Sequence, residues 1–168
     1  EEGSLEELKE CLGIALNNPY EKGKANYLLA RRAYQLKDKK AGNAFLKEAV
    51  KFSYEPAKLW KNNADAETML EKIRIAYQNP ASDGEDVMRC CKGCEKILYL
   101  TPAVEKSYRG EAAFVLYKYI RAGKYQSSTN ETADYYLKIS NNCGFYLAQE
   151  EWKVNNESRI ISQIMRAE

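Results

Sequence analysis

Three cysteines within five residues, Cys90, Cys91 and Cys94, are the side chains of this sequence best suited to chemistry. Cys91 and Cys94 form a C-x-x-C motif. In thioredoxin-like proteins this motif follows a strand and opens a helix, where the helix N-terminus lowers the thiol pKa. A zinc site would need further ligands, and only Cys11 and Cys143 remain beyond the cluster. The cluster therefore raises a redox or metal-binding module as one hypothesis.

The pattern around the motif favours a packing role instead. A helical stripe runs through it, at Val87, Cys91, Cys94 and Leu98. The motif then lies in the middle of a helix, and free cysteine is among the most buried residue types. An odd total of five cysteines also argues against a complete disulfide framework, although it leaves room for one bridge.

The rest of the sequence offers few catalytic groups. It contains no histidine, which excludes Ser-His-Asp and Cys-His nucleophile sets and most zinc sites. It also contains no Walker-type or dinucleotide-binding glycine motif. Adjacent carboxylates such as Glu150 and Glu151 point apart on a helix, so we interpret them as a solvated face. We therefore expect no enzyme activity and no cofactor.

Composition is typical of a globular protein that binds neither nucleic acid nor membrane. The 168 residues are 45% hydrophobic and 30% charged, and 26 basic against 24 acidic residues leave a net charge of +2. That balance gives no reason to expect nucleic acid as a partner, and no apolar run approaches the ~20 residues of a membrane helix. A cytoplasmic location is favoured; a leader removed before Glu1 would instead allow a secreted or periplasmic one.

The elements that must position these residues are predicted to be helices. Apolar residues recur at helical spacing, and Pro19, Pro80 and Pro102 act as breakers, so no strand is expected. A first helix begins near Ser4, whose spacing to Glu7 fits a capping box. About eight helices follow from the pattern, the others spanning roughly 21–36, 40–53, 56–78, 84–100, 104–122, 130–141 and 145–166. Two details stay open. The helix at 56–78 either runs through or breaks near Asn62-Asn63, and the helix that ends near residue 141 is capped by either Thr129 or Asn130.

Two stretches of the sequence repeat one another. Cys11 and Ile14 match Cys94 and Ile97 at an offset of 83 residues, and the offset grows to 87 and then 91 further along. Insertions in a repeat belong in loops, whose length costs little free energy. We therefore predict one helical-repeat domain over 1–168. Its parts are full units at about 5–60 and 88–153, a divergent unit at about 61–101, and a C-terminal capping helix at about 145–166.

Small residues at fixed places within these units suggest a family. The first copy carries Ala25, Leu28-Leu29, Ala33-Tyr34, then Ala41, Ala44-Phe45, Lys47, Ala49 and Ala57; the second fits as Ala112 to Tyr119, then Ala133, Tyr136-Leu137-Lys138, Gly144 and Ala148. The pattern resembles the Sel-one-like repeat, a tetratricopeptide-like helix pair, in a degenerate form. Ala30 and Tyr117 stand where the family has glycine. The resemblance implies an α-solenoid, a right-handed superhelix of antiparallel helix pairs whose concave face binds proteins.

Two equivalent trios are the candidate partner-binding residues: Tyr27, Arg31 and Tyr34, and Phe114, Lys118 and Arg121. Both trios place an aromatic residue one turn before a cation, beside the packing stripe. If the first helices line a groove, these residues would converge there, and aromatic residues with Arg dominate interface hot spots. The competing interpretation is that the aromatics are core residues and the cations are surface solubilisers.

Three functional hypotheses follow from the sequence. The first is a non-catalytic scaffold that binds a peptide or partner protein in a concave groove through the two trios. The second is a cysteine-based redox or metal-binding module that uses Cys90, Cys91 and Cys94. The third is a structural segment of a larger protein, without a groove ligand.

Overall fold

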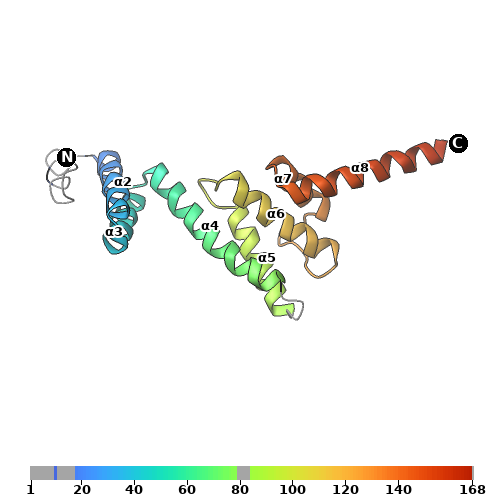
Figure 1. The fold of residues 1–168 in the computed structure, drawn as a ribbon, viewed down its shortest axis with the longest axis horizontal. Helices are drawn as coiled ribbons and strands as arrows, with labels where there is room; N and C mark the ends of the chain where they lie inside the picture. Colours follow the sequence, from blue (N-terminus) through green and yellow to red (C-terminus); the bar gives the residue numbers. More distant parts are fainter. Residues whose placement is uncertain (1–9, 11–17, 79–83, 168) are drawn as a thin grey trace. The chain divides into compact units, whose positions relative to one another are not determined.

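The computed structural model describes residue 10, residues 18–78 and residues 84–167, and this part of the chain contains seven helices and no strand (Figure 1). The predicted all-helical class is therefore confirmed for these residues. The capping box at Ser4, the first helix with Cys11, and the turn at Asn79-Pro80 lie outside them. None of the described helices is both long enough and apolar enough to cross a bilayer. The helices are α2 (Pro19–Gln35), α3 (Lys39–Lys51), α4 (Glu55–Gln78), α5 (Gly84–Leu98), α6 (Lys106–Arg121), α7 (Ala133–Asn142) and α8 (Tyr146–Ala167).

Short polar side chains begin several of these helices. Asn18 caps α2 by accepting a hydrogen bond from the Glu21 amide at 2.7 Å, with Pro19 in the first turn. Thr132 caps α7, and its hydroxyl accepts from the Tyr135 amide at 3.3 Å. The prediction that Thr129 or Asn130 caps this helix was wrong. The chain is still turning at Asn130, where φ is 57°, so the extended residue that a helix needs comes two positions later.

Helix α4 runs without a break through Asn62-Asn63. Asparagine costs a helix only a few tenths of a kcal/mol relative to its neighbours, which is too little to end one. The alternative of an interrupted helix is thereby settled in favour of a continuous one.

The chain divides into two compact units, Glu1–Ala64 and Asp65–Glu168, with the boundary inside α4. In the first unit α2 packs on α3, and Ala30, Ala49 and Ala57 are fully buried together with Leu46 and Tyr54. In the second unit α6 packs on α5 and on α7, and α7 on α8. Its core includes Leu70, Leu116, Tyr117, Tyr136 and Leu137, with Trp152 packed at the edge.

The same close approach recurs in both units. A Cβ atom placed on Gly23 of α2 would lie 2.8 Å from the Tyr54 Cβ and 3.3 Å from the Phe52 Cβ, in the turn between α3 and α4. A Cβ placed on Gly110 of α6 would lie 3.0 Å from the Cys143 and Phe145 Cβ atoms, in the turn between α7 and α8. The offsets, 87 residues for the glycines and 91 for the turns, are those of the sequence alignment. Helix α2 therefore touches the turn that follows α3, and α6 touches the turn that follows α7.

The two turns also share their backbone conformation. Ser53 and Gly144 both have positive φ, 59° and 77°, and follow the last residue of α3 and α7 by two. The Tyr54 amide donates to the Ala49 carbonyl, and the Phe145 amide donates to the Ser140 carbonyl, both at 3.2 Å. These bonds satisfy helix-end carbonyl groups and fix the direction in which the third helix leaves.

Replacing either close-approach glycine by alanine is expected to destabilise the fold by about 1–3 kcal/mol, because a methyl group there collides with the turn. Chemical denaturation of Gly23→Ala and Gly110→Ala measures the effect. Gly84→Ala is the matched control: its Cβ would meet nothing within 4 Å, so stability should stay equal or rise by up to about 1 kcal/mol. Equal stability in all three variants would contradict the close packing.

Candidate functional site

The first trio of candidate residues lies on α2, within the first unit. The Tyr27 and Tyr34 rings lie 5.6 and 5.2 Å from the Trp60 ring of α4, and the Tyr34 hydroxyl donates to Asn43 Oδ1 of α3 at 2.5 Å. Both tyrosines are half-buried, whereas Arg31 is exposed. The two aromatic residues thus attach α2 to the other helices of their unit, and Arg31 alone of the trio faces water.

The second trio lies on α6, within the second unit. Phe114 is only 8% exposed, and its ring lies 5.4 Å from Phe145. It belongs to the core rather than beside the packing stripe, contrary to the expected position. The Lys118 ammonium lies 5.9 Å from the Phe114 ring centroid, and the Arg121 guanidinium lies 5.6 Å from the Tyr117 ring. The predicted alternation of ring and cation is therefore present on α6 as cation–π contacts.

Both cations of this trio converge on Glu151 of α8. Its carboxylate lies 3.2 Å from the Lys118 nitrogen and 3.3 Å from the nearest Arg121 nitrogen. The Tyr117 hydroxyl donates to Glu151 at 3.0 Å and accepts a bond from Arg121. Burial raises the pKa of Glu151, but the hydrogen bonds from Lys118 and Tyr117 and the two positive charges outweigh it, so the pKa lies below its ordinary value. Glu151 stays ionised at neutral pH and holds α6 to α8.

The repeat places these contacts at equivalent positions. Trp60 corresponds to Glu151 at the offset of 91, and Tyr34 corresponds to Arg121 at the offset of 87. The ring pair between α2 and α4 in the first unit is therefore replaced by an ion pair between α6 and α8 in the second unit. Tyr27 and Tyr34 thus meet at Trp60 without Arg31, and Lys118 and Arg121 meet at Glu151. That both trios line one groove stays a prediction.

A hollow of about 450 Å³ opens beside the second trio. Its apolar lining includes Tyr77, Leu147 and Val154, which are 44%, 40% and 59% exposed. Phe114 and Lys118 line it as well, with Glu150 and Glu151 at its polar edge. Exposed apolar side chains around a concavity, with charges beside them, are what a binding site for a partner side chain needs.

Sequence reasoning found part of this site and missed part. It singled out Phe114 and Lys118, but took Glu150 and Glu151 together as a solvated face. Glu150 is exposed and pairs with Lys153 at 3.2 Å, whereas Glu151 turns toward α6. The signal that separates them is the repeat, because the position of Glu151 is occupied by inward-facing Trp60 in the first copy. Tyr77, Leu147 and Val154 carried no comparable signal, since single exposed apolar residues are common.

The cysteine cluster lies inside the second core. Cys90, Cys91 and Cys94 of α5 are 5%, 0% and 0% exposed, and these three and half-buried Cys143 are free thiols. Burial, with Cys90 and Glu95 nearby, raises the pKa of Cys91 to about 12, and burial raises that of Cys94 well above its ordinary value. Thiolate is the reactive form, so these positions suit packing better than redox chemistry. Within the described part of the chain, no three Cys, Asp, Glu or His side chains are grouped to hold a metal ion.

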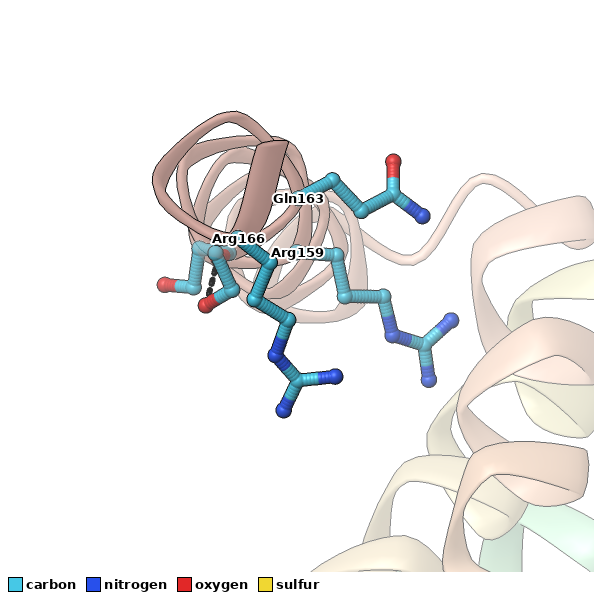
Figure 2. A pocket seen from close by; sticks show the side chains of 5 residues that line it. Arg159, Gln163 and Arg166 are labelled. Carbon is cyan, nitrogen blue, oxygen red and sulfur yellow. Dashed lines mark hydrogen bonds between the residues drawn. The ribbon is translucent and has the colours of Figure 1, made fainter. Parts of the chain in front are cut away.

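A second hollow lies on α8 alone. Ser158, Arg159, Ser162, Gln163 and Arg166 line it, so one helix supplies the whole lining. Figure 2 shows Arg159 and Arg166 extending in the same direction from the helix while Gln163 points elsewhere. Arg159 pairs with Asp134 of α7 at 2.9 Å. With no second element to enclose a ligand, we do not regard this surface as a candidate site.

Native-state thiol labelling tests the burial of the cluster. At pH 8 we expect Cys90, Cys91 and Cys94 to react with a disulfide reagent at least about 100-fold more slowly than after unfolding, because they are buried and protonated. Mass spectrometry of the labelled peptides identifies the residues. Rapid labelling of any of the three in the folded protein would restore the redox hypothesis.

Replacing Glu151 by glutamine tests the ion-pair network. At pH 7 the substitution should cost about 1 kcal/mol of unfolding free energy, since it removes a partly buried, hydrogen-bonded charge pair. The folded-state pKa is lowered, so this contribution is present above the unfolded carboxyl pKa of about 4.3 and is lost as the pH falls through the folded value. The difference in unfolding free energy between wild type and variant, measured by denaturation, should therefore be larger at pH 7 than at pH 3. A pH-independent difference would show that Glu151 acts through packing alone.

Comparison of the chain with protein-family models, with curated proteins and with solved structures finds no match.

Proposed function

We propose that this protein is a non-catalytic interaction module that binds a segment of another protein in the hollow beside Phe114 and Lys118. The observation that carries the proposal is the hollow itself, where Tyr77, Leu147 and Val154 are exposed around a concavity. A partner side chain placed there would bury apolar surface, and this burial contributes about 25 cal/mol of binding free energy per Å². The buried, protonated cysteines and the histidine-free sequence fit a binding role better than a catalytic one.

The charges beside the hollow suggest the chemistry of the partner. Lys118 and Arg121 share one carboxylate, that of Glu151, so this cluster carries one excess positive charge. The Arg121 side chain is 55% exposed and can donate further hydrogen bonds. We infer a partner segment with a large apolar side chain followed or preceded by an aspartate or glutamate.

The wider architecture belongs to the same proposal. The recurrence of the glycine contact and of the turn supports two related helical units. We propose that they are degenerate Sel-one-like repeats in a tetratricopeptide-like α-solenoid, and that Tyr27, Arg31 and Tyr34 extend the binding surface. Exposed Arg31 is the member of this trio most available to a partner.

Selection from a random peptide display library tests the proposal. Peptides retained by the wild type, but not by Val154→Lys, should be enriched in a large apolar residue next to an acidic one. Their affinity should fall at least tenfold in Val154→Lys, and about three- to tenfold in Arg121→Gln, which removes a charged donor. Arg31→Ala then measures whether the first trio takes part.

Ile75→Lys is the matched control, because Ile75 is an aliphatic residue of similar exposure, 68% against 59% for Val154, and does not line the hollow. This variant should bind the selected peptides as the wild type does. Equal loss of binding in both variants, or no peptide that distinguishes the wild type from Val154→Lys, would contradict the proposed site.

A further inference from the structure

The C-terminal half of α8 carries an apolar face that nothing in the described structure covers. Ile160, Ile161 and Ile164 are 56%, 56% and 58% exposed, and every described side chain from 157 to 166 is exposed. In Figure 1 this half of α8 extends beyond α5, α6 and α7 of its own unit. A capping helix would be expected to turn polar residues outward, so this face needs another explanation.

The internal repeat offers an explanation, because it shows which residues of α4 and α8 are equivalent. Helices α4 and α8 begin at equivalent residues, Glu55 and Tyr146, at the offset of 91 that also relates Trp60 to Glu151. Both helices are continuous, so the offset holds along them. Three positions toward their ends then correspond: Met69 to Ile160, Leu70 to Ile161, and Ile73 to Ile164.

On α4, Leu70 and Ile73 are buried and Met69 is partly buried, in contact with the next helices of the chain. Leu70 is 0% and Ile73 is 4% exposed, in one cluster with Cys90, Cys91 and Cys94 of α5. A Cβ on Gly93 of α5 would lie 3.2 Å from Met69 Sδ and 3.3 Å from Ile73 Cδ1. Helix α6 joins the contact, because Arg74 forms two 2.6 Å hydrogen bonds with Glu111. The apolar face of α4 is thus the base on which a following helix pair packs.

The first half of each chain carries sequence counterparts of α5 and α6. Cys11 and Ile14 match Cys94 and Ile97 in sequence, and α2 matches α6 through the glycine contact. Leu28 of α2 corresponds to Val115 of α6; Val115 is 8% exposed in the core of its unit, whereas Leu28 is 41% exposed. Within the described part of the chain, the α2 surface at Leu28 is therefore exposed where the equivalent α6 surface is buried.

The charged positions have changed in a compatible way. Arg74 of α4 corresponds to Met165 of α8, and its partner Glu111 corresponds to Lys24 of α2. If α2 of one chain met α8 of another, Lys24 would face the uncharged Met165. An arginine at position 165, like its equivalent Arg74, would instead repel Lys24.

We propose that the Ile160, Ile161 and Ile164 face of α8 binds a second copy of this chain, head to tail, through the α2 surface that contains Leu28. The contact reproduces the packing of α6 on α4. It uses two different surfaces, so it is heterologous, and in a pair one copy keeps a free α8 face while the other keeps a free α2 surface.

Complementary variants test both the contact and its polarity. In sedimentation and light-scattering experiments, the average mass of the wild type should rise with concentration. Ile161→Glu combined with Ile164→Glu, and separately Leu28→Glu, should each weaken association at least tenfold and leave monomers. Mixed together, the two variants should form a dimer of one copy of each, because one intact α8 face then meets one intact α2 surface.

Ser158→Glu combined with Ser162→Glu is the control, since it adds the same two charges to the same helix outside the isoleucine face and should associate as the wild type does. All substituted residues are exposed in a single chain, so the helical circular dichroism of each variant should be unchanged. A wild type that stays monomeric at all concentrations would overturn the proposal. Dimers of Leu28→Glu alone would also overturn it, because they would show symmetric pairing of two α8 helices.

Discussion

The close approach of α2 to the turn after α3, and of α6 to the turn after α7, is the constraint on which the other contacts depend. Gly23 and Gly110 let α2 and α6 come close enough to the turns for the ring pairs Tyr27–Tyr54 and Phe114–Phe145 to form, each with centroids 5.4 Å apart. The same turns set the direction of α4 and α8. A side chain at Gly23 would push α4 outward and separate Trp60 from Tyr34. A side chain at Gly110 would push α8 outward and separate Glu151 from Arg121, so the hollow and the ion pair both require glycine at position 110.

With this geometry common to both units, the chemistry at its centre is free to differ. In the first unit aromatic rings fill the space between α2 and α4. In the second unit a charged network joins α6 to α8, made by Tyr117, Lys118, Arg121 and Glu151. Rings contribute buried apolar area and are insensitive to salt. A partly exposed ion-pair network contributes less to stability, but it leaves donors directed at the surface. This difference is why the candidate site lies in the second unit rather than in the first.

Periodicity was enough to predict the helices of the described residues and the mid-helix position of the cysteine cluster, because both follow from spacing along one chain segment. The contacts that depend on distant segments were not predictable in this way. The family resemblance places glycine at the positions of Ala30 and Tyr117, whereas the close approach falls seven residues earlier, at Gly23 and Gly110. Glu151 looked like its neighbour Glu150, since adjacent residues carry no sign of which one faces another helix. The cap of α7 fell at Thr132 because the preceding loop is longer than capping preferences alone indicate.

The distribution of tryptophan gives the molecule a built-in optical readout. The sequence contains two tryptophans, and the division within α4 leaves Trp60 in the first unit and Trp152 in the second. Trp60 is surrounded by tyrosine rings, while Trp152 packs at the edge of the larger core. Their emission spectra therefore report on different environments, and replacing one of them by phenylalanine leaves a fluorophore specific to the other unit. Whether the two halves melt as one cooperative body or in succession can be read from these signals without any added label.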